Sequence, residues 1–299
     1  MTNSLSINGG GIRGIIPCSV LAALEQQTGK LTRDLFSYVA GTSTGALLAA
    51  GVAAGIPACE LLTVYTTRSK DVFTPTGLIA DAKRVAEGFM YDPKSLHKVL
   101  TSVYGNAAAW SMNDCPIGIC LPAAAMNGHD WYFVRDGARN ARTTGTVKLI
   151  DAAVASASAP TYFDHWPITV AGQALAFFDG GAGGLANPSY QACVEMFEYD
   201  TFLPAQTRLI SLGTGFYPGS NAPPKGLIDV VSWATDTLVD TSEDWVDRAV
   251  ERQWPGVKQK FDWQLPSNIA MDDLSAIPAL VAAGKTAAAS TDWKQILGV

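Results

Sequence analysis

A serine flanked by glycines is the strongest chemical signal in the sequence. In Gly41-Thr42-Ser43-Thr44-Gly45, the serine follows the apolar pair Val39-Ala40 and precedes a run of small apolar residues. A serine hydroxyl can attack a carbonyl when it projects from a sharp strand-to-helix turn, and Gly41 and Gly45 leave the space that such a turn needs. At a helix start it would also lie beside free backbone N–H groups. The pattern predicts a nucleophile elbow, although a plain glycine-rich turn between core elements can share it.

A glycine loop near the amino terminus could bind an anion. The short strand pattern Leu5-Ser6-Ile7 leads into Asn8-Gly9-Gly10-Gly11-Ile12-Arg13-Gly14, and an amphipathic helix pattern follows. Such a loop can hold the pyrophosphate of a dinucleotide or the oxyanion of a tetrahedral acyl-transfer intermediate. The dinucleotide interpretation requires an acidic residue at the end of the second strand. Here Asp34 precedes that strand, which ends in the serine elbow, so the oxyanion hole is favoured.

Asp179 is the candidate base. It ends the apolar strand pattern 174–178 and precedes Gly180-Gly181, and strand ends of α/β sheets commonly carry active-site groups. The alternative is a simple turn aspartate, because Asp-Gly pairs are frequent in turns. The usual chain order of serine, acid and histidine is missing, since all three histidines precede Asp179 and none lies between glycines or at the end of a strand pattern: His97, His129 and His165. Partial desolvation would raise the pKa of Asp179 and make it a better base.

Strand and helix patterns alternate along the chain, which predicts one α/β domain over residues 1–299 with a mainly parallel sheet. The part from about residue 225 reads as mostly helical, with periodic segments at 227–238 and 274–281. Segment 71–91 has no clean period, and we expect a surface excursion that could serve as a lid or interfacial region. Further strands are expected at 117–121, 131–134 and 208–212, and helices at 46–54, from Pro57, from Asp92-Pro93 to Gly105, and at 149–158.

Composition excludes several classes of protein. Apolar residues make up 48% and charged residues 16%, which indicates a globular chain. The net charge is −6 and the 21 Lys and Arg residues are scattered, so neither nucleic acid nor a strong electrostatic anchor to anionic lipid is expected. Five irregularly spaced cysteines predict no disulfide framework and no zinc site, and favour a reducing compartment.

No targeting segment is apparent in the sequence. The amino terminus lacks a basic region followed by an apolar core, so no secretory signal is predicted. Segment 40–58 is apolar but contains glycines, hydroxyl residues and a proline, which favours a buried helix over a membrane span. We therefore expect a cytoplasmic protein.

In combination, four ordered segments resemble the patatin-like lipid acyl hydrolases, and residues 211–215 and 265–273 are similar to later blocks of that family. The four are Gly9-Gly10-Gly11-Ile12-Arg13-Gly14, Gly41-Thr42-Ser43-Thr44-Gly45, residues 155–163 and Asp179-Gly180-Gly181. The sequence departs from the family at Asn8, where aspartate is common, and in the longer spacing from Asp179 to Asn187-Pro188.

The resemblance implies a three-layer α/β/α fold and a Ser43–Asp179 dyad that works without histidine. It also implies an oxyanion hole from Gly9, Gly10 and Gly11 with Arg13 close by, and no metal or other cofactor. The expected reaction is hydrolysis of carboxylic esters in phospholipids or related acyl lipids, at a membrane or micelle surface. Two alternatives stay open: a histidine-dependent esterase with His129 or His165 near Ser43, and a lipid-binding interaction protein on the same fold.

Overall fold

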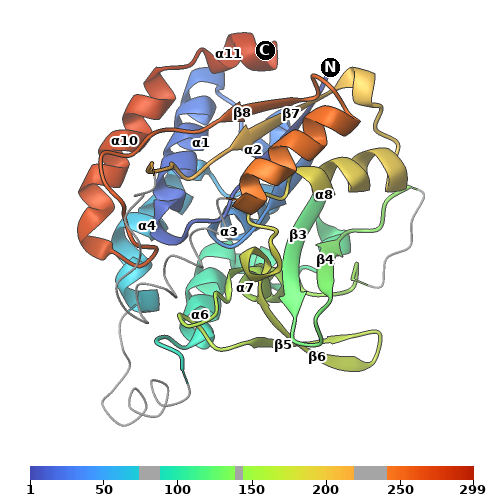
Figure 1. Ribbon diagram of the computed structural model, residues 1–299, viewed down its shortest axis with the longest axis vertical. Coiled ribbons are helices and arrows are strands. Elements are labelled where there is room, and N and C mark those ends of the chain that lie inside the picture. Colours follow the sequence, from blue (N-terminus) through green and yellow to red (C-terminus); the bar gives the residue numbers. More distant parts are fainter. Residues whose placement is uncertain (74–87, 139–143, 219–240) are drawn as a thin grey trace.

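The computed structural model describes residues 1–73, 88–138, 144–218 and 241–299. In these ranges eight strands form one sheet, in the order β5-β6-β3-β2-β1-β7-β8, with β4 paired to β3 (Figure 1). The strands are β1 (Thr2–Ile7), β2 (Tyr38–Gly41), β3 (Gly118–Ala125), β4 (Asp130–Val134), β5 (Trp166–Val170), β6 (Gln173–Asp179), β7 (Thr207–Leu212) and β8 (Lys258–Phe261).

Helices cover both faces of the sheet, so the predicted three-layer α/β/α fold is confirmed (Figure 1). Side chains alternate between the faces along each strand. Val39 of β2 packs into the larger core, whereas its neighbours Tyr38 and Ala40 pack into the smaller one. The larger core lies under α1 (Ile15–Thr28), α3 (Thr44–Ala54), α4 (Ala58–Phe73), α6 (Pro93–Tyr104), α7 (Leu149–Ala157) and α10 (Ile277–Ala289), and the smaller one under α8 (Ser189–Val194) and residues 241–253.

The sheet is mainly parallel, as predicted. Strands β3, β2, β1, β7 and β8 pair in parallel, while β4 and β6 each run antiparallel to β3. This corrects the reasoning that placed Asp179 at the carboxyl end of a strand of the parallel set. Asp179 arrives on antiparallel β6 and pairs with Ala123, beyond the point where β2 stops beside β3. The carboxyl half of β3 extends past the end of β2 and pairs with β6 there, which brings the end of β6 close to the elbow.

Most predicted elements form at the predicted places. Gly29 and Gly55 end α1 and α3 in the left-handed conformation, with φ of 70° and 79°. Asp92 caps α6 by accepting a hydrogen bond from the Lys94 N–H. Strands β5 and β8 were not predicted, and β8 lies in the part expected to be mostly helical. That part otherwise contains residues 241–253, α10 and α11 (Trp293–Leu297); segment 227–238 and most of the expected lid, 74–87, lie outside the described residues.

None of the helices in the described part of the chain combines the length and the apolar character that crossing a bilayer requires. The five cysteines are all free, and only Cys59 is exposed.

Candidate active site

Ser43 occupies a strained turn between β2 and α3. Its φ is 57° and its ψ is −127°, a backbone region that residues with a Cβ rarely adopt. A Cβ on Gly41 would lie 2.0 Å from the carbonyl oxygen of Gly45, and one on Gly45 would lie 2.2 Å from that of Ile7. Both positions therefore require glycine, and the strand-turn-helix context predicted for the elbow is present.

The carboxyl group of Asp179 lies beside Ser43. The serine hydroxyl is close enough to this carboxyl to lower its pKa, and the Gly181 N–H donates a 2.7 Å hydrogen bond to Oδ1. Only 4% of Asp179 is exposed. Burial raises the pKa of its carboxyl to about 6, although the Ser43 hydroxyl and the Gly181 N–H act in the opposite direction. A group with this pKa is suited to accept a proton near neutral pH.

The three histidines are used elsewhere in the fold. The ring of His97 stacks on Trp166 at 5.1 Å, and its Nε2 lies 3.4 Å from Asp151. His165 pairs with the adjacent Asp164, and His129 is exposed in the turn between β3 and β4. In the described ranges no histidine is hydrogen-bonded to Ser43 or Asp179.

The glycine loop lies against the elbow, since a Cβ on Gly9 would come within 3.2 Å of the Ser43 Cβ. The Gly9 N–H donates to the carbonyl of Ala186 at 2.9 Å, so it is not free to bind an oxyanion. The N–H groups of Gly10 and Gly11 donate to no described residue, and φ values of 155° and 58° give the loop its turn. Arg13 donates hydrogen bonds to the carbonyl oxygens of Gly10 and Gly215, each at 3.4 Å. Its side chain therefore binds carbonyl groups and stabilises the loop.

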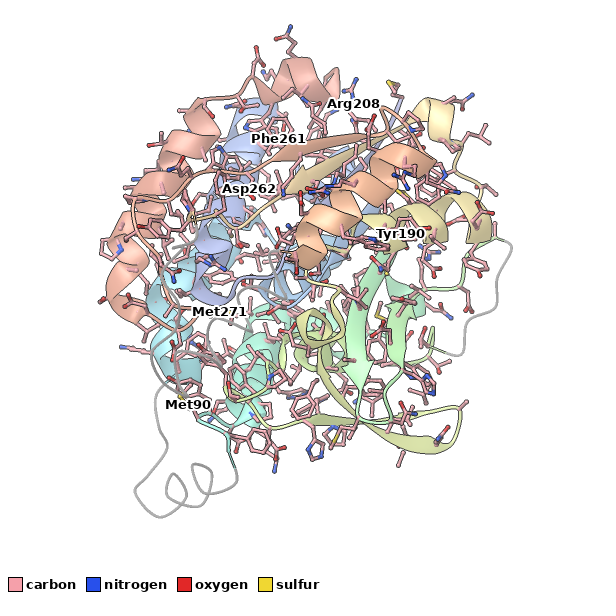
Figure 2. All side chains as sticks on the ribbon, in the orientation of Figure 1. Met90, Tyr190, Arg208, Phe261, Asp262 and Met271 are labelled. Atoms are coloured by element: carbon pink, nitrogen blue, oxygen red, sulfur yellow. The ribbon has the colours of Figure 1, made fainter. Side chains whose placement is uncertain are left out.

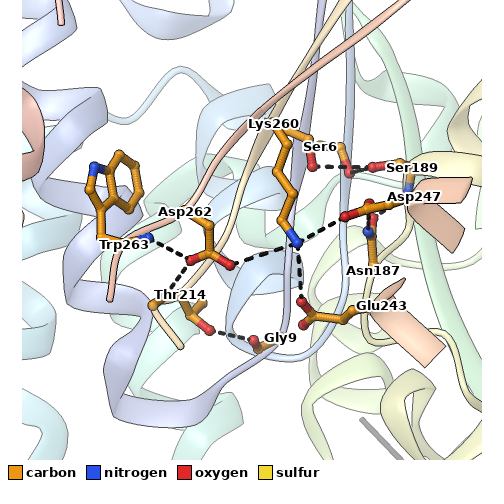
Figure 3. Close-up of polar contacts among 12 residues, drawn as sticks. Ser6, Gly9, Asn187, Ser189, Thr214, Glu243, Asp247, Lys260, Asp262 and Trp263 are labelled. Carbon is orange, nitrogen blue, oxygen red and sulfur yellow. Dashed lines mark hydrogen bonds and ion pairs between the residues drawn. The ribbon is translucent and has the colours of Figure 1, made fainter. Parts of the chain in front are cut away.

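Residues that directly follow β7 and β8 support the glycine loop (Figure 3). Thr214 Oγ1 donates to the carbonyl of Gly9 at 2.8 Å. Asp262 accepts hydrogen bonds from the N–H groups of Gly215 and Trp263, both at 2.9 Å. The sequence predicted a strand from Arg208 that runs into Gly213 and Gly215, but nothing in it singled out Asp262, which follows the short polar strand β8.

A second carboxylate, that of the partly buried Asp247, fixes the segment that follows Asp179 (Figure 3). Asp247 accepts a hydrogen bond from Asn187 Nδ2 at 2.6 Å and pairs with both Lys258 and Lys260. Burial alone would raise the pKa of Asp247, but the hydrogen bonds from the two lysines outweigh it and hold that pKa below its usual range. Since Asn187 follows Ala186, this cluster positions the carbonyl that binds Gly9.

An apolar pocket opens at Ser43 and Gly11. Met271 is one of its lining residues and is labelled in Figure 2, and its carbonyl accepts a 2.7 Å hydrogen bond from the Ile12 N–H. The next residue, Asp272, accepts a 2.8 Å hydrogen bond from the Tyr91 hydroxyl. Most of the lining is aliphatic or aromatic and comes from α3, α4, α6 and residues 157–163: Leu47, Leu48, Leu61, Val64, Tyr65, Val72, Phe73, Leu96, Val99, Leu100, Val103, Tyr104, Ala157, Ala159, Tyr162 and Phe163.

Comparisons with known proteins find relatives among the phospholipases. The family model described as patatin-like phospholipase matches residues 5–189. The chain is similar to the cGAMP-activated phospholipase of Escherichia coli (strain TW11681), with 32% identity over 64% of this chain and 55% of that protein. It is also similar to rat calcium-independent phospholipase A2-gamma, with 30% identity over 78% of this chain and 32% of that protein. The solved structure of VipD from Legionella pneumophila aligns over 99% of this chain and 66% of its own, with 13% identity and a TM-score of 0.46.

The chain thus spans 55–61% of the length of the cGAMP-activated phospholipases that it matches. The family match includes the glycine loop, the elbow and Asp179. The chain belongs to the patatin-like phospholipase family.

Proposed function

We propose that this protein is a serine acyl hydrolase that cleaves carboxylic esters of phospholipids, with Ser43 as nucleophile and Asp179 as its direct base. One observation carries the proposal: the Ser43 hydroxyl lies beside a buried carboxyl group, and Ser43 lines an apolar pocket. A lipid-binding protein on this fold would need the pocket but neither the strained serine nor the carboxylate beside it. A histidine-dependent esterase would need a histidine within reach of Ser43.

The chemistry follows from this arrangement. Asp179 accepts the hydroxyl proton while Ser43 Oγ bonds to the ester carbonyl carbon, and the N–H groups of Gly10 and Gly11 bind the resulting oxyanion. Asp179 then returns the proton to the departing alcohol, which leaves an acyl group on Ser43. In the second half, Asp179 takes a proton from water, the hydroxide displaces the acyl group, and Ser43 recovers its proton as the fatty acid leaves.

The pocket supports a lipid as the substrate. Its walls supply apolar contact for an acyl chain, which is the part of a phospholipid that such a surface can remove from water. The named relatives are phospholipases, and we expect the same substrate class here, presented at a membrane or micelle surface. Activation by cGAMP is a property in the names of several relatives, so the assay includes an arm with that nucleotide.

The test is release of fatty acid and lysophospholipid from vesicles of mixed phospholipid head groups, with and without cGAMP. We expect product from the wild-type protein and at least a thousandfold less from Ser43→Ala, because the nucleophile is lost. Ser156→Ala is a less suitable control, since Ser156 Oγ bonds to the Pro122 carbonyl beside the elbow. Thr67→Ala, on the exposed side of α4, is the matched control and should retain activity. Equal product from wild type and Ser43→Ala would refute the assignment.

A further inference from the structure

Two contacts between α3 and α4 indicate the direction in which the apolar pocket extends away from Ser43. We call the part of the pocket that is furthest from Ser43 in this direction its inner end. Beside the nucleophile, the Tyr65 hydroxyl bonds to Thr44, the next residue in the chain. Further along α3, away from Ser43, Gly51 lies against Leu61 of α4, which also lines the pocket. Helices α3 and α4 therefore run antiparallel along the pocket. Gly51 is eight residues after Ser43, which places it about 12 Å further along the helix axis at 1.5 Å per residue.

The described residues at this inner end form a dry wall. Leu48, Leu61 and Tyr104 are buried, with at most 5% of each exposed. The Tyr104 hydroxyl is bound to the Leu47 carbonyl at 2.6 Å, so its ring is held in place and only apolar atoms are left for an occupant. The hydroxyl groups of Tyr65 and Tyr104 both bond to α3. Neither hydroxyl is therefore left to bind a polar part of a substrate, such as an ester or a head group.

We infer that Leu61 blocks the far end of the acyl-chain pocket, and we call this block the stop; the inference rests on the proposed function. The position of the stop selects substrates by the length of their acyl chain. The lack of a side chain at Gly51 leaves room for the Leu61 side chain. A Cβ at position 51 would lie 2.7 Å from Leu61 Cδ2 and 2.9 Å from Leu61 Cδ1. The chain that best fits fills the space between Ser43 and Leu61. A longer chain must displace Leu61 or leave its end outside.

Two substitutions should move this stop in opposite directions. Leu61→Ala removes the wall and extends the pocket, so the preferred chain becomes longer. Gly51→Ala pushes the flexible end of Leu61 toward the pocket, so the preferred chain becomes shorter. Leu61→Val is a smaller truncation and should give an intermediate shift. Leu62→Ala deletes the same atoms one position further along α4, outside the lining, and is the matched control.

The measurement is kcat/KM for p-nitrophenyl esters from butyrate to palmitate. In the wild type, each methylene group that the pocket can still accommodate should raise kcat/KM about fourfold. Once the acyl chain reaches Leu61, a further methylene should give no further increase in kcat/KM. The ratio of rates on long and short esters should rise at least tenfold in Leu61→Ala, fall in Gly51→Ala and stay unchanged in Leu62→Ala.

The outcomes separate the two proposals. An unchanged chain-length profile in folded Leu61→Ala, Leu61→Val and Gly51→Ala would overturn the stop while leaving Ser43 chemistry intact. Lack of hydrolysis of every ester by folded wild-type protein would overturn the proposed function, and the stop with it.

Discussion

At the scale of single residues, the proposed mechanism requires Asp179 to serve both folding and chemistry. Burial favours its protonated form and raises its pKa from 3.8 to about 6. The native state therefore binds more protons than the unfolded chain between these two values, and the free energy of unfolding falls as the pH rises through that window. Above it, the ionised carboxylate costs the native state about 3 kcal/mol, because each tenfold change in proton affinity corresponds to about 1.4 kcal/mol. The carboxylate that the proposed reaction needs in its ionised form is therefore one whose neutral form is more stable in the folded protein.

Asp179→Asn should separate the two demands. At pH 8 we expect a free energy of unfolding no lower than that of the wild type, because the amide keeps the shape without a buried charge. We expect kcat/KM to fall at least a thousandfold, since the amide accepts no proton. Urea unfolding from pH 4 to pH 8 tests the first expectation, and the variant should lack the part of the decline that Asp179 causes. The wild-type kcat/KM should show an acid limb with a midpoint near pH 6. A variant that is less stable at pH 8 would contradict this account.

At the scale of elements, the polypeptide around residues 241–253 and β8 anchors the glycine loop without contributing to the chemistry. Lys258 is only 7% exposed and pairs with Asp247, which also holds Asn187. Removing the carboxylate leaves a buried ammonium group without its anion, which typically costs about 3–5 kcal/mol.

Asp247→Ala should therefore lower the free energy of unfolding by about 3–5 kcal/mol. Its kcat should fall by up to about a hundredfold, because the support of Ala186 and Gly9 is loosened. The control lies one turn earlier: Asp244 pairs with Arg248 at the surface, where the side chains are 63% and 79% exposed. Asp244→Ala should change stability by less than about 1 kcal/mol. Denaturant melts and steady-state kinetics on both variants check this, and equal effects would show that the buried cluster has no special role.

The elements that sequence patterns predicted are those with strong local signals. Gly29, Gly55 and the Asp92-Pro93 pair mark helix ends through backbone geometry and capping, which depend on few neighbours. Strand β8 reads Lys-Gln-Lys-Phe, and its lysines are accommodated only because Asp247 and Asp262 lie next to them in the fold. Strand β5 has a proline and a partly exposed face, so its pairing with β6 depends on the edge of the sheet, not on local pattern.

At the scale of the whole molecule, the candidate site draws on segments spread over most of the sequence. Ser43 and Asp179 could be predicted because each follows an apolar strand pattern and has glycines close to it in the sequence. Thr214 and Met271 contact the glycine loop from distant parts of the sequence, and Asp262 binds Gly215, whose carbonyl accepts a hydrogen bond from Arg13. Local sequence pattern alone does not reveal such long-range contacts. The same holds for the hydrogen bond that removes the Gly9 N–H from the donors available to an oxyanion.

The central claim is that a carboxylate, without histidine, activates the nucleophile. The most direct test is kcat/KM on p-nitrophenyl butyrate for two folded variants measured side by side. One carries Asp179→Asn and the other carries His97→Gln, His129→Gln and His165→Gln together. We predict that the first is close to inactive while the second keeps most of the wild-type rate. Retained hydrolysis in Asp179→Asn, or its loss in a folded histidine variant, would contradict the dyad.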